Sequence, residues 1–400
     1  MYVPSEKLLA SYADVLVGFA LGGGKGMKKG QSVYLVVPTP ALLLGKAIYR
    51  RILEMGGNPI LSLIDDDFKL IQLQCGTDRQ LTYFPHRYYR GLAGTIDHWV
   101  RILSERDPMF LKGADPRKII LSNRAAKPFR DWLDKKEDAG RFTWTLCLYG
   151  TPGMAREAGM GLAAYWQQIE RACFLDERDP IARWRTVFRE IAGIVDALNR
   201  LPVRTLHVRA PRTDLRITLG DKRRWLGGSG RNIPSFEIFT SPDWRGTEGI
   251  IHFDLPLYRY GNIIKGVALE FRNGRIVKAS AEKNEKLLHE MIKQKNADKI
   301  GEFSLTDGRF SRITRFMAET LFDENHGGTF GNTHLAVGKS YHDTYAGDAK
   351  KLTGAQFERL GFNDSVEHTD IIASTDRTVT AVLADGSKKV IYEHGRFTLN

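Results

Sequence analysis

Six acidic and imidazole side chains in the second half of the sequence have the chemistry to hold metal ions together. They are Glu237, Glu302, Glu324, His334, His368 and Asp370. Carboxylates mixed with imidazoles suit Zn, Mn or Co better than Ca or Mg alone. The set is larger than one tetrahedral zinc can use. It fits two metal ions about 3.5–4 Å apart, bridged by a carboxylate and a water.

Each of these residues also has an ordinary structural interpretation. Glu302 and Glu324 would serve as exposed acids at helix ends, and His334 as a core imidazole with satisfied hydrogen bonds. The segment HTDII is more specific: side chains two apart in a strand share one face, so His368 and Asp370 would point together. A solvent-facing edge strand permits the same pattern. Acids and histidines separated by long gaps also match many chains by chance, so both interpretations stay open.

Signatures of other hydrolases are missing from the sequence. It contains no G-x-S-x-G elbow and no H-E-x-x-H helix motif. The glycine-rich segment 22–30, GGGKGMKKG, does not match the phosphate-loop pattern and follows an expected helix, so we interpret it as a connection. None of the cysteines lies in a C-x-x-C pair or in a nucleophile signature.

The first half predicts a layered α/β domain with a largely parallel sheet, because helices and strands alternate along it. We expect helices at 5–20, 40–57 and 127–138, and strands at 31–38, 58–64, 117–123 and 142–150. A helical region follows from about 154 to 200.

The second half predicts an α+β catalytic domain rich in antiparallel strands. Apolar and polar residues alternate with a period of two in segments 205–210, 213–220, 248–258, 264–281 and 378–397. RNGR and DGSK are turns typical of β-hairpins. We expect helices at 281–295 and 311–322, and a domain boundary near residue 200, giving domains 1–200 and 201–400.

Composition narrows the class of protein. The 400 residues favour two domains, and 42% hydrophobic with 26% charged residues is typical of a globular chain. No apolar run reaches the roughly 18 residues of a membrane-spanning helix. Three scattered cysteines and no export signal predict a cytoplasmic protein. The net charge of +12 raises the possibility of RNA binding, but the basic residues are scattered, so we disfavour a nucleic-acid partner.

Several motifs together resemble the thermophilic aminopeptidase family, which includes aminopeptidases S and T and the PepS-type enzymes. They are NIPSFEIFTSPD at 232–243, IGE at 300–302, LFDEN at 321–325, THLAVGKSY at 333–341 and EHTDIIAS at 367–374. They occur in the family's order and at compatible gaps. The resemblance extends over nearly the whole chain, and it is more specific in the second half than in the first.

The resemblance implies a metallopeptidase that removes N-terminal residues from peptides with two divalent cations, which would be Zn, Co, Mn or Mg. It also implies an N-terminal α/β domain, a C-terminal catalytic domain and a homodimer that encloses the sites. All six residues named above match the family's metal-ligand positions. Glu302 would be the bridging carboxylate and general base, and Tyr341 would donate a hydrogen bond to the tetrahedral oxyanion.

One ligand and the reaction itself have alternatives. The gap between Glu324 and His334 is longer than in family members with a short DEN-to-His spacing, so His326 is a second candidate ligand. We favour His334, because HLAVGKSY is the matching stretch. Similar ligands would also serve a dinuclear phosphoesterase. A basic RNA-binding protein without catalysis is the third and least favoured alternative.

Overall fold

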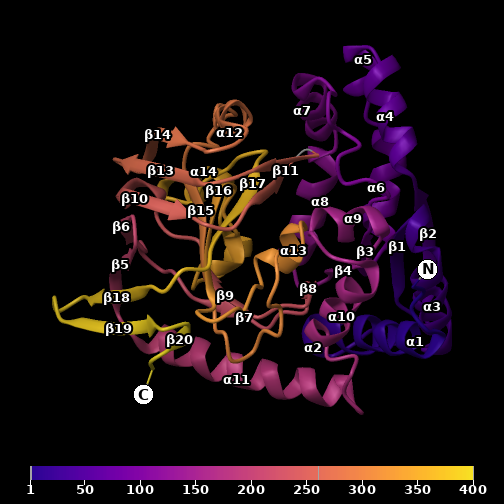
Figure 1. Ribbon diagram of the computed structural model, residues 1–400, viewed down its shortest axis with the longest axis horizontal. Coiled ribbons are helices and arrows are strands. Elements are labelled where there is room, and N and C mark those ends of the chain that lie inside the picture. Colours follow the sequence, from indigo (N-terminus) through magenta and orange to yellow (C-terminus); the bar gives the residue numbers. More distant parts are fainter. Residues whose placement is uncertain (1, 260, 400) are drawn as a thin grey trace. The chain divides into compact units, whose positions relative to one another are not determined.

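The computed structural model describes residues 2–259 and 261–399 and divides into two compact units. The first comprises Met1–Arg185, Ser229–Ser235 and Tyr260–Asn262, and the second comprises the remaining segments. Figure 1 labels the elements of each unit. Among the described residues, no helix combines the length and apolar character needed to cross a bilayer.

A five-stranded parallel sheet forms the centre of the first unit. Its strand order is β2-β1-β3-β4-β8, with β1 at Ser32–Pro38, β2 at Asn58–Ile64, β3 at His98–Leu103, β4 at Thr143–Leu148 and β8 at Asn232–Ile233. The inner strand β1 is buried on both faces, as expected of a parallel strand with helices on either side. The largely parallel sheet predicted for this half is confirmed.

Helices cover both faces of this sheet. Tyr34 and Val36 of β1 pack in a core cluster with residues of α6, His86–Thr95, and of α8, Lys127–Asp138. Val37 points the other way, against Gly45 of α3, Leu42–Glu54, where a side chain on the glycine would clash. The helix α1, Glu6–Val15, packs on α3. Other helices of this unit are α2 (Leu21–Gly24), α4 (Asp66–Cys75), α5 (Asp78–Leu81), α7 (Pro116–Ala125), α9 (Pro152–Glu157) and α10 (Leu162–Ala172).

One strand predicted in this half is wrong. Residues 117–123 belong to the helix α7, because Asp115 caps its first turn by accepting a hydrogen bond from Arg117 N at 2.8 Å and Pro116 occupies its first position. The strand that lies between β1 and β4 is β3, which we did not predict. The long helix α11, Pro180–Arg200, contributes residues to both units.

The second unit contains an eight-stranded antiparallel sheet ordered β14-β13-β10-β6-β5-β18-β19-β20. Its strands are β5 (Val203–Ala210), β6 (Thr213–Thr218), β10 (Glu248–Phe253), β13 (Val267–Arg272), β14 (Arg275–Ser280), β18 (Thr378–Leu383), β19 (Lys388–Glu393) and β20 (Arg396–Phe397). At RNGR, Asn273 and Gly274 both have positive φ, as a tight hairpin turn requires. The antiparallel character predicted for this half is confirmed.

A smaller antiparallel sheet of the second unit has the order β17-β16-β15-β9-β7, and we call it the site sheet. Its strands are β7 (Leu226–Gly227), β9 (Glu237–Thr240), β15 (Ile300–Thr306), β16 (Asn332–Gly338) and β17 (His368–Ala373). The remaining elements are a two-stranded sheet of β11 (Leu257–Arg259) and β12 (Asn262–Ile264), and the helices α12 (Glu285–Ile292), α13 (Thr320–Asp323) and α14 (Gly354–Arg359).

The helix predicted at 281–295 is present as the shorter α12, whereas the one predicted at 311–322 is wrong. Only Thr320–Asp323 is helical there. The buried Asp323 carboxylate accepts hydrogen bonds from the backbone N–H groups of Met317 (2.7 Å) and Glu319 (3.0 Å), and Ala318 has a positive φ of 52°. These backbone groups are therefore satisfied outside a helix.

Candidate metal centre

The register of the site sheet brings predicted ligands onto one face. Ala336, in the middle of β16, is aligned with Glu302 on β15 and with Asp370 on β17. His334 lies two residues before Ala336, and side chains two apart in a strand share a face. Glu302, His334 and Asp370 therefore project from the same side of the sheet.

Two further predicted ligands, each at the first residue of its strand, project from the same side of the sheet. His368 lies two residues before Asp370 on β17, and Glu237 begins β9, aligned with Thr306 of β15. Thr306 follows Glu302 by four residues, so Thr306 and its partner Glu237 lie on the same side as Glu302. We call this side, with Glu237, Glu302, His334, His368 and Asp370, the ligand face.

The other positions of β15 and β16 explain why five candidate ligands can converge. Ala336 and Ser304 are small, so the middle of the ligand face is not filled by bulky side chains. The alternate positions are apolar and fully buried on the opposite face: Phe303, Leu305, Leu335, Val337 and Ile371. Because this opposite face is buried, the register of the strands is fixed, and the residues at the alternate positions must project from the ligand face.

The five side chains form two overlapping groups around Glu302. His334 Nε2 lies 3.3 Å from Oε1 of Glu302 and 3.4 Å from Oε2 of Glu237. His368 Nε2 lies 3.4 Å from Oε2 of Glu302 and 3.5 Å from Oδ1 of Asp370. Each carboxylate oxygen of Glu302 thus faces a different imidazole. Ligand atoms within each group lie within 4.8 Å of one another.

The carboxylates outweigh burial in setting the pKa values of the two imidazoles. Burial alone lowers the pKa of His334, but its hydrogen bond to Glu302 and the surrounding negative charges raise it to about 9. Burial also lowers the pKa of His368, but the charges of Asp370 and Glu302 and their hydrogen bonds with the imidazole raise it well above its usual value. Burial would raise the pKa of Asp370, yet the charge and hydrogen bond of His368 hold it at about 2. The ligand face therefore favours positive charge strongly.

Glu324 approaches this group from outside the site sheet. It directly follows α13 and is buried, so it is not the exposed acid that the structural interpretation expected. Burial raises the pKa of Glu324 well above its usual value, and the negative charges of Glu237, Asp370 and Glu302 raise it further. Glu324 therefore interacts electrostatically with these carboxylates, but among the described residues it belongs to neither group with metal-ligand spacing.

Two asparagines that we did not predict hold Glu324 in place. Asn325 Oδ1 accepts a hydrogen bond from Phe236 N at 2.6 Å, which ties the start of β9 to the end of α13. Asn332 Nδ2 donates to the carbonyl oxygens of Glu324 (2.9 Å) and His326 (2.7 Å), which closes the glycine-rich segment on itself. The partner of Asn325 is 89 residues away in the sequence, whereas those of Asn332 are six and eight residues away, and neither contact is visible in the motifs themselves.

Tyr341 lies beside the ligand face. Its ring centroid is 4.9 Å from that of the His368 imidazole, edge to face, and 5.7 Å from that of Phe239. Its backbone N–H donates to Ser241 Oγ at 2.9 Å. The structure therefore brings the predicted oxyanion donor next to one of the predicted ligands, on the chain that follows β16.

The alternative ligand His326 is placed in a different environment. Its pKa is lowered by burial, and the groups that partly offset this are the carboxylate of Asp254 and the backbone of Arg315. Among the described residues, the groupings of His, Cys, Asp and Glu with metal-ligand spacing contain His334 and His368 but not His326.

The donor set fits divalent metal ions. Three carboxylates and two imidazoles meet in one largely buried group, with the buried Glu324 carboxyl interacting with it electrostatically, and burying so many acidic groups without cations is strongly unfavourable. Mixed nitrogen and oxygen donors are those that Zn and Mn accept. The Nδ1–H of His368 donates to the carbonyl oxygen of Lys339 at 2.8 Å, which leaves Nε2 as the atom that would bind a metal.

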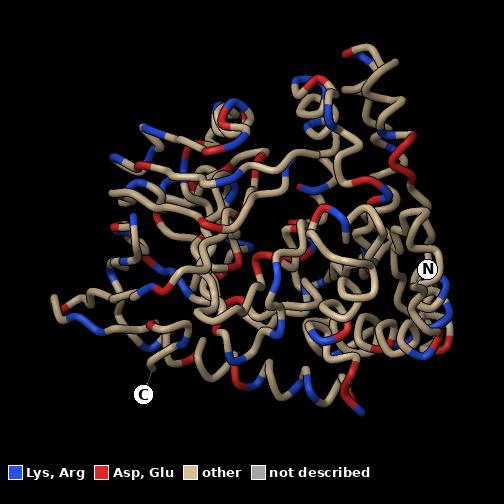
Figure 2. The backbone as a smooth tube through the Cα atoms, in the orientation of Figure 1, with Lys and Arg blue, Asp and Glu red and all other residues tan. Residues whose placement is uncertain are grey.

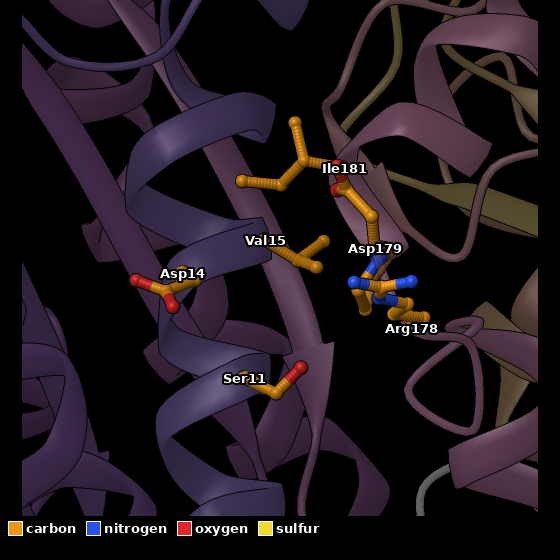
Figure 3. Close-up of a pocket in the computed structure, with 7 residues that line it drawn as sticks. Ser11, Asp14, Val15, Arg178, Asp179 and Ile181 are labelled. Atoms are coloured by element: carbon orange, nitrogen blue, oxygen red, sulfur yellow. The ribbon is translucent and has the colours of Figure 1, made fainter.

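A cavity of about 430 Å³ in the first unit shows no comparable chemistry (Figure 3). It is lined by Ser11, Asp14, Val15, Arg178, Asp179, Pro180 and Ile181. Asp14 forms an ion pair with Arg51 at 2.6 Å. Asp179 accepts a hydrogen bond from Ala182 N at 2.9 Å, at the start of α11. Its acids therefore have structural partners.

Comparisons with known proteins agree with this geometry. Residues 5–397 match the family described as thermophilic metalloprotease (M29). The chain is 29% identical to Aminopeptidase 2 of Geobacillus stearothermophilus, covering 98% of both chains. It is 28% identical to Aminopeptidase T of Thermus thermophilus, covering 96% of this chain and 98% of the relative.

The fold also has a solved counterpart. The structure of wild-type AmpT from Thermus thermophilus superposes with a TM-score of 0.83 at 24% identity, covering 98% of this chain and 99% of that one. The resemblance inferred from the sequence motifs is confirmed by the family match over nearly the whole length. The chain belongs to the thermophilic metalloprotease family M29.

Proposed function

We propose that this metalloprotease is an aminopeptidase that uses two divalent cations held on the ligand face. The observation that carries the proposal is the position of Glu302, which belongs to both groups of candidate ligands and presents one oxygen to each. A shared carboxylate is the arrangement expected of a dinuclear hydrolase. The names of the relatives, all aminopeptidases, support peptides with a free N-terminus as substrates.

Charge balance supports two cations rather than one. Glu237, Glu302, Glu324 and Asp370 would together carry four negative charges in a largely buried group. Two divalent cations neutralise this charge while leaving both imidazoles neutral, as metal-binding histidines must be. A single cation would leave a buried excess of negative charge, which is costly in a site of low dielectric constant.

The roles of the protein groups follow from their positions. Cations bound here would supply Lewis acidity and an activated water. The Glu302 carboxylate would accept the proton of the attacking water and return it to the leaving amine. The Tyr341 hydroxyl, beside His368, would donate a hydrogen bond to the developing oxyanion, a contribution of about 2.7–4 kcal/mol where single donors have been removed. Glu237 and His368 are the more exposed ligands, so substrate would enter over them.

The test is the Glu302→Gln variant, assayed with an aminoacyl-nitroanilide alongside metal analysis. Because Glu302 is proposed as both the shared ligand and the base, we expect the variant to bind metal more weakly and, at saturating metal, to lose activity by about 10²–10⁴-fold, the range for loss of a general base. Glu290→Gln, on the exposed face of α12, is the matched control and should match the wild type. Activity of Glu302→Gln equal to the wild type would exclude the base, and about one metal per wild-type chain would exclude the dinuclear site.

The phosphoesterase alternative is less well supported. Phosphate substrates call for arginine or lysine clamps, and the nearby arginines have acidic partners: Arg309 pairs with Asp307 at 2.5 Å and Arg259 with Glu367 at 2.8 Å. Parallel assays with a nitrophenyl phosphate separate the two reactions. RNA binding is also disfavoured, since lysines and arginines are spread along both units rather than gathered into one stripe (Figure 2). The cytoplasmic location stays a prediction.

We also propose that the protein is a homodimer, as the family resemblance implies. Support comes from apolar exposure in the first unit, where the edge strand β2 exposes Leu61 and Leu63 and the following helix α4 exposes Phe68 and Ile71. An apolar edge strand pairs readily with an antiparallel copy of itself. Light scattering should give twice the chain mass for the wild type and a monomer for Leu63→Lys.

A further inference from the structure

Two buried polar atoms on the ligand face have no hydrogen-bond partner among the described residues. They are Nδ1 of His334 and Oγ of Ser304, whose residues are 1% and 0% exposed. The register of β15 and β16 places Ser304 directly opposite His334. Paired residues of antiparallel strands have Cα atoms about 4.5–5.5 Å apart. An imidazole nitrogen and a hydroxyl at such positions are suitable partners for each other.

The imidazole of His368 has a hydrogen-bond acceptor at Nδ1, which the imidazole of His334 lacks among the described residues. In His368, the Nδ1–H donates to the Lys339 carbonyl oxygen at 2.8 Å, and Nε2 faces Glu302 and Asp370. An acceptor at Nδ1 fixes the tautomer and the orientation of the ring, and it makes Nε2 a better metal ligand. His334 presents its Nε2 to carboxylates in the same way, but no backbone carbonyl serves its Nδ1 among the described residues.

We propose that Ser304 is the positioning residue for His334: its hydroxyl oxygen accepts the Nδ1–H of His334 when Nε2 binds a metal ion. The proposal rests on the proposed function, because it requires His334 to be a ligand. Rotation about the Cα–Cβ bond of Ser304 turns Oγ toward the ring without moving the backbone. The bond satisfies two buried groups at once, and leaving either group unpaired is unfavourable.

Two other buried oxygens without a partner are less suitable acceptors. Thr333 Oγ1 belongs to the residue before His334, so it lies on the opposite face of the site sheet. The Cα atom of Asn332 lies two residues along β16, about 7 Å from that of His334 by the rise of a strand. The amide nitrogen of Asn332 is already held by two backbone carbonyl groups. Of these three residues, Ser304 is therefore the one that faces His334 directly across the ligand face.

The experiment compares the Zn²⁺ affinity of the full-length protein and its variants by competition with a chromogenic chelator. Ser304→Ala removes the acceptor and should weaken binding by about 10–100-fold, the usual effect of losing a group that orients a metal ligand. Ser304→Thr keeps the hydroxyl and should restore most of the affinity. Thr333→Val removes a buried hydroxyl next to His334 on the other face, so it should bind Zn²⁺ like the wild type.

A second measurement reports the tautomer directly. In protein labelled with ¹⁵N-histidine and loaded with Zn²⁺, we expect a slowly exchanging Nδ1–H signal for His334 in the wild type and in Ser304→Thr. The same signal should exchange faster in Ser304→Ala, since its hydrogen bond is missing. Thermal unfolding of each variant separates this local effect from a general loss of stability.

The outcomes distinguish this inference from the proposed function. A wild-type protein that binds no Zn²⁺ would overturn both. Tight binding by the wild type together with unchanged affinity in Ser304→Ala would overturn the role of Ser304 alone. An equal loss of affinity in Ser304→Ala and Thr333→Val would also overturn it, because the effect would then follow from deleting any buried hydroxyl in this sheet.

Discussion

Two buried histidines, one in each unit, have opposite electrostatic properties. His98, which begins β3 in the parallel sheet, is 3% exposed, and His334 in the site sheet is 1% exposed. Burial lowers the pKa of His98 to about 4, whereas His334 reaches about 9 despite its burial. The sign of the shift is therefore decided by the neighbours rather than by the depth of burial.

The hydrogen-bond partners of His98 are neutral, and the opposing charges of Asp97 and Lys136 act on it only from nearby. Its Nε2 lies 2.9 Å from Gln31 Oε1 and its Nδ1 lies 2.7 Å from Thr143 Oγ1. Since an amide oxygen only accepts, Nε2 carries the proton and Nδ1 accepts from the threonine hydroxyl. His98 thus acts as an uncharged connector between neighbouring segments, while His334 is surrounded by Glu302, Glu237 and Asp370. The structural histidine and the proposed metal ligand thus differ in their partners.

Replacing each histidine with alanine is the strongest test of this comparison. His334→Ala removes a proposed ligand, so activity and metal affinity should each fall by more than about 100-fold, the upper range for groups that only support a ligand. His98→Ala should leave both within experimental error of the wild type in the folded protein. A large loss of metal in His98→Ala, or none in His334→Ala, would contradict the assignment of roles.

Added metal should stabilise the protein only through the site sheet. With free Zn²⁺ at 100 times its dissociation constant, the free energy of unfolding should rise by about 2.7 kcal/mol for each site filled. Differential scanning calorimetry with and without metal measures the shift. His98→Ala should keep the whole increment and His334→Ala should lose most of it; an equal increment in both variants would place the metal elsewhere.

The stability of the metal-free protein should depend on His98. His98→Ala leaves the Gln31 and Thr143 side chains without their imidazole partner and should lower the free energy of unfolding by about 1–3 kcal/mol. Chemical denaturation of chelator-treated protein gives this value. His394→Ala, which removes an exposed imidazole paired with Asp376, is the control and should cost less than about 1 kcal/mol. Equal losses in the two variants would argue against a structural role for His98.

Mild acid should lower the free energy of unfolding through the protonation of His98. Between pH 6.5 and 4 the unfolded chain binds a proton at His98 that the folded chain does not, so stability falls as the pH falls through this window. The loss from this group approaches about 2 kcal/mol at pH 5. Stability measured at pH 7 and pH 5 should differ less in His98→Asn than in the wild type, and an unchanged difference would show that other groups carry the acid sensitivity.

Local patterns predicted most of the regular elements correctly. The apolar run at 32–38 and the glycine pair after 54 define β1 and α3, and the RNGR turn defines a hairpin. The two elements predicted wrongly lie where a polar side chain satisfies backbone groups. Asp115 starts a helix in a segment that is apolar enough for a strand, and Asp323 holds 317–319 in a loop despite its helical composition. Such capping bonds override propensity.

The candidate site was likewise predictable from the sequence only in part. The residue types of the six candidate ligands suggested a metal site, because metal chemistry restricts ligands to a few side chains, whereas the metallopeptidase activity was inferred from the resemblance of the surrounding motifs to a family. Glu237 lies 65 positions before Glu302 in the numbering. The two residues join one group because β9 pairs with β15. Pairing between distant strands is not visible in either segment.

By itself the sequence determined the chemistry that is available: which carboxylates and imidazoles exist, and the period of two that puts alternate residues on one face of a strand. Tertiary structure decided which of them meet. Register aligns Ala336 with Glu302 and Asp370, puts His334 rather than His326 among the carboxylates, and sets Ser304 opposite His334. The physical reason is that the alternation is a local property of the backbone, whereas register is chosen by burying the opposite apolar face as a whole.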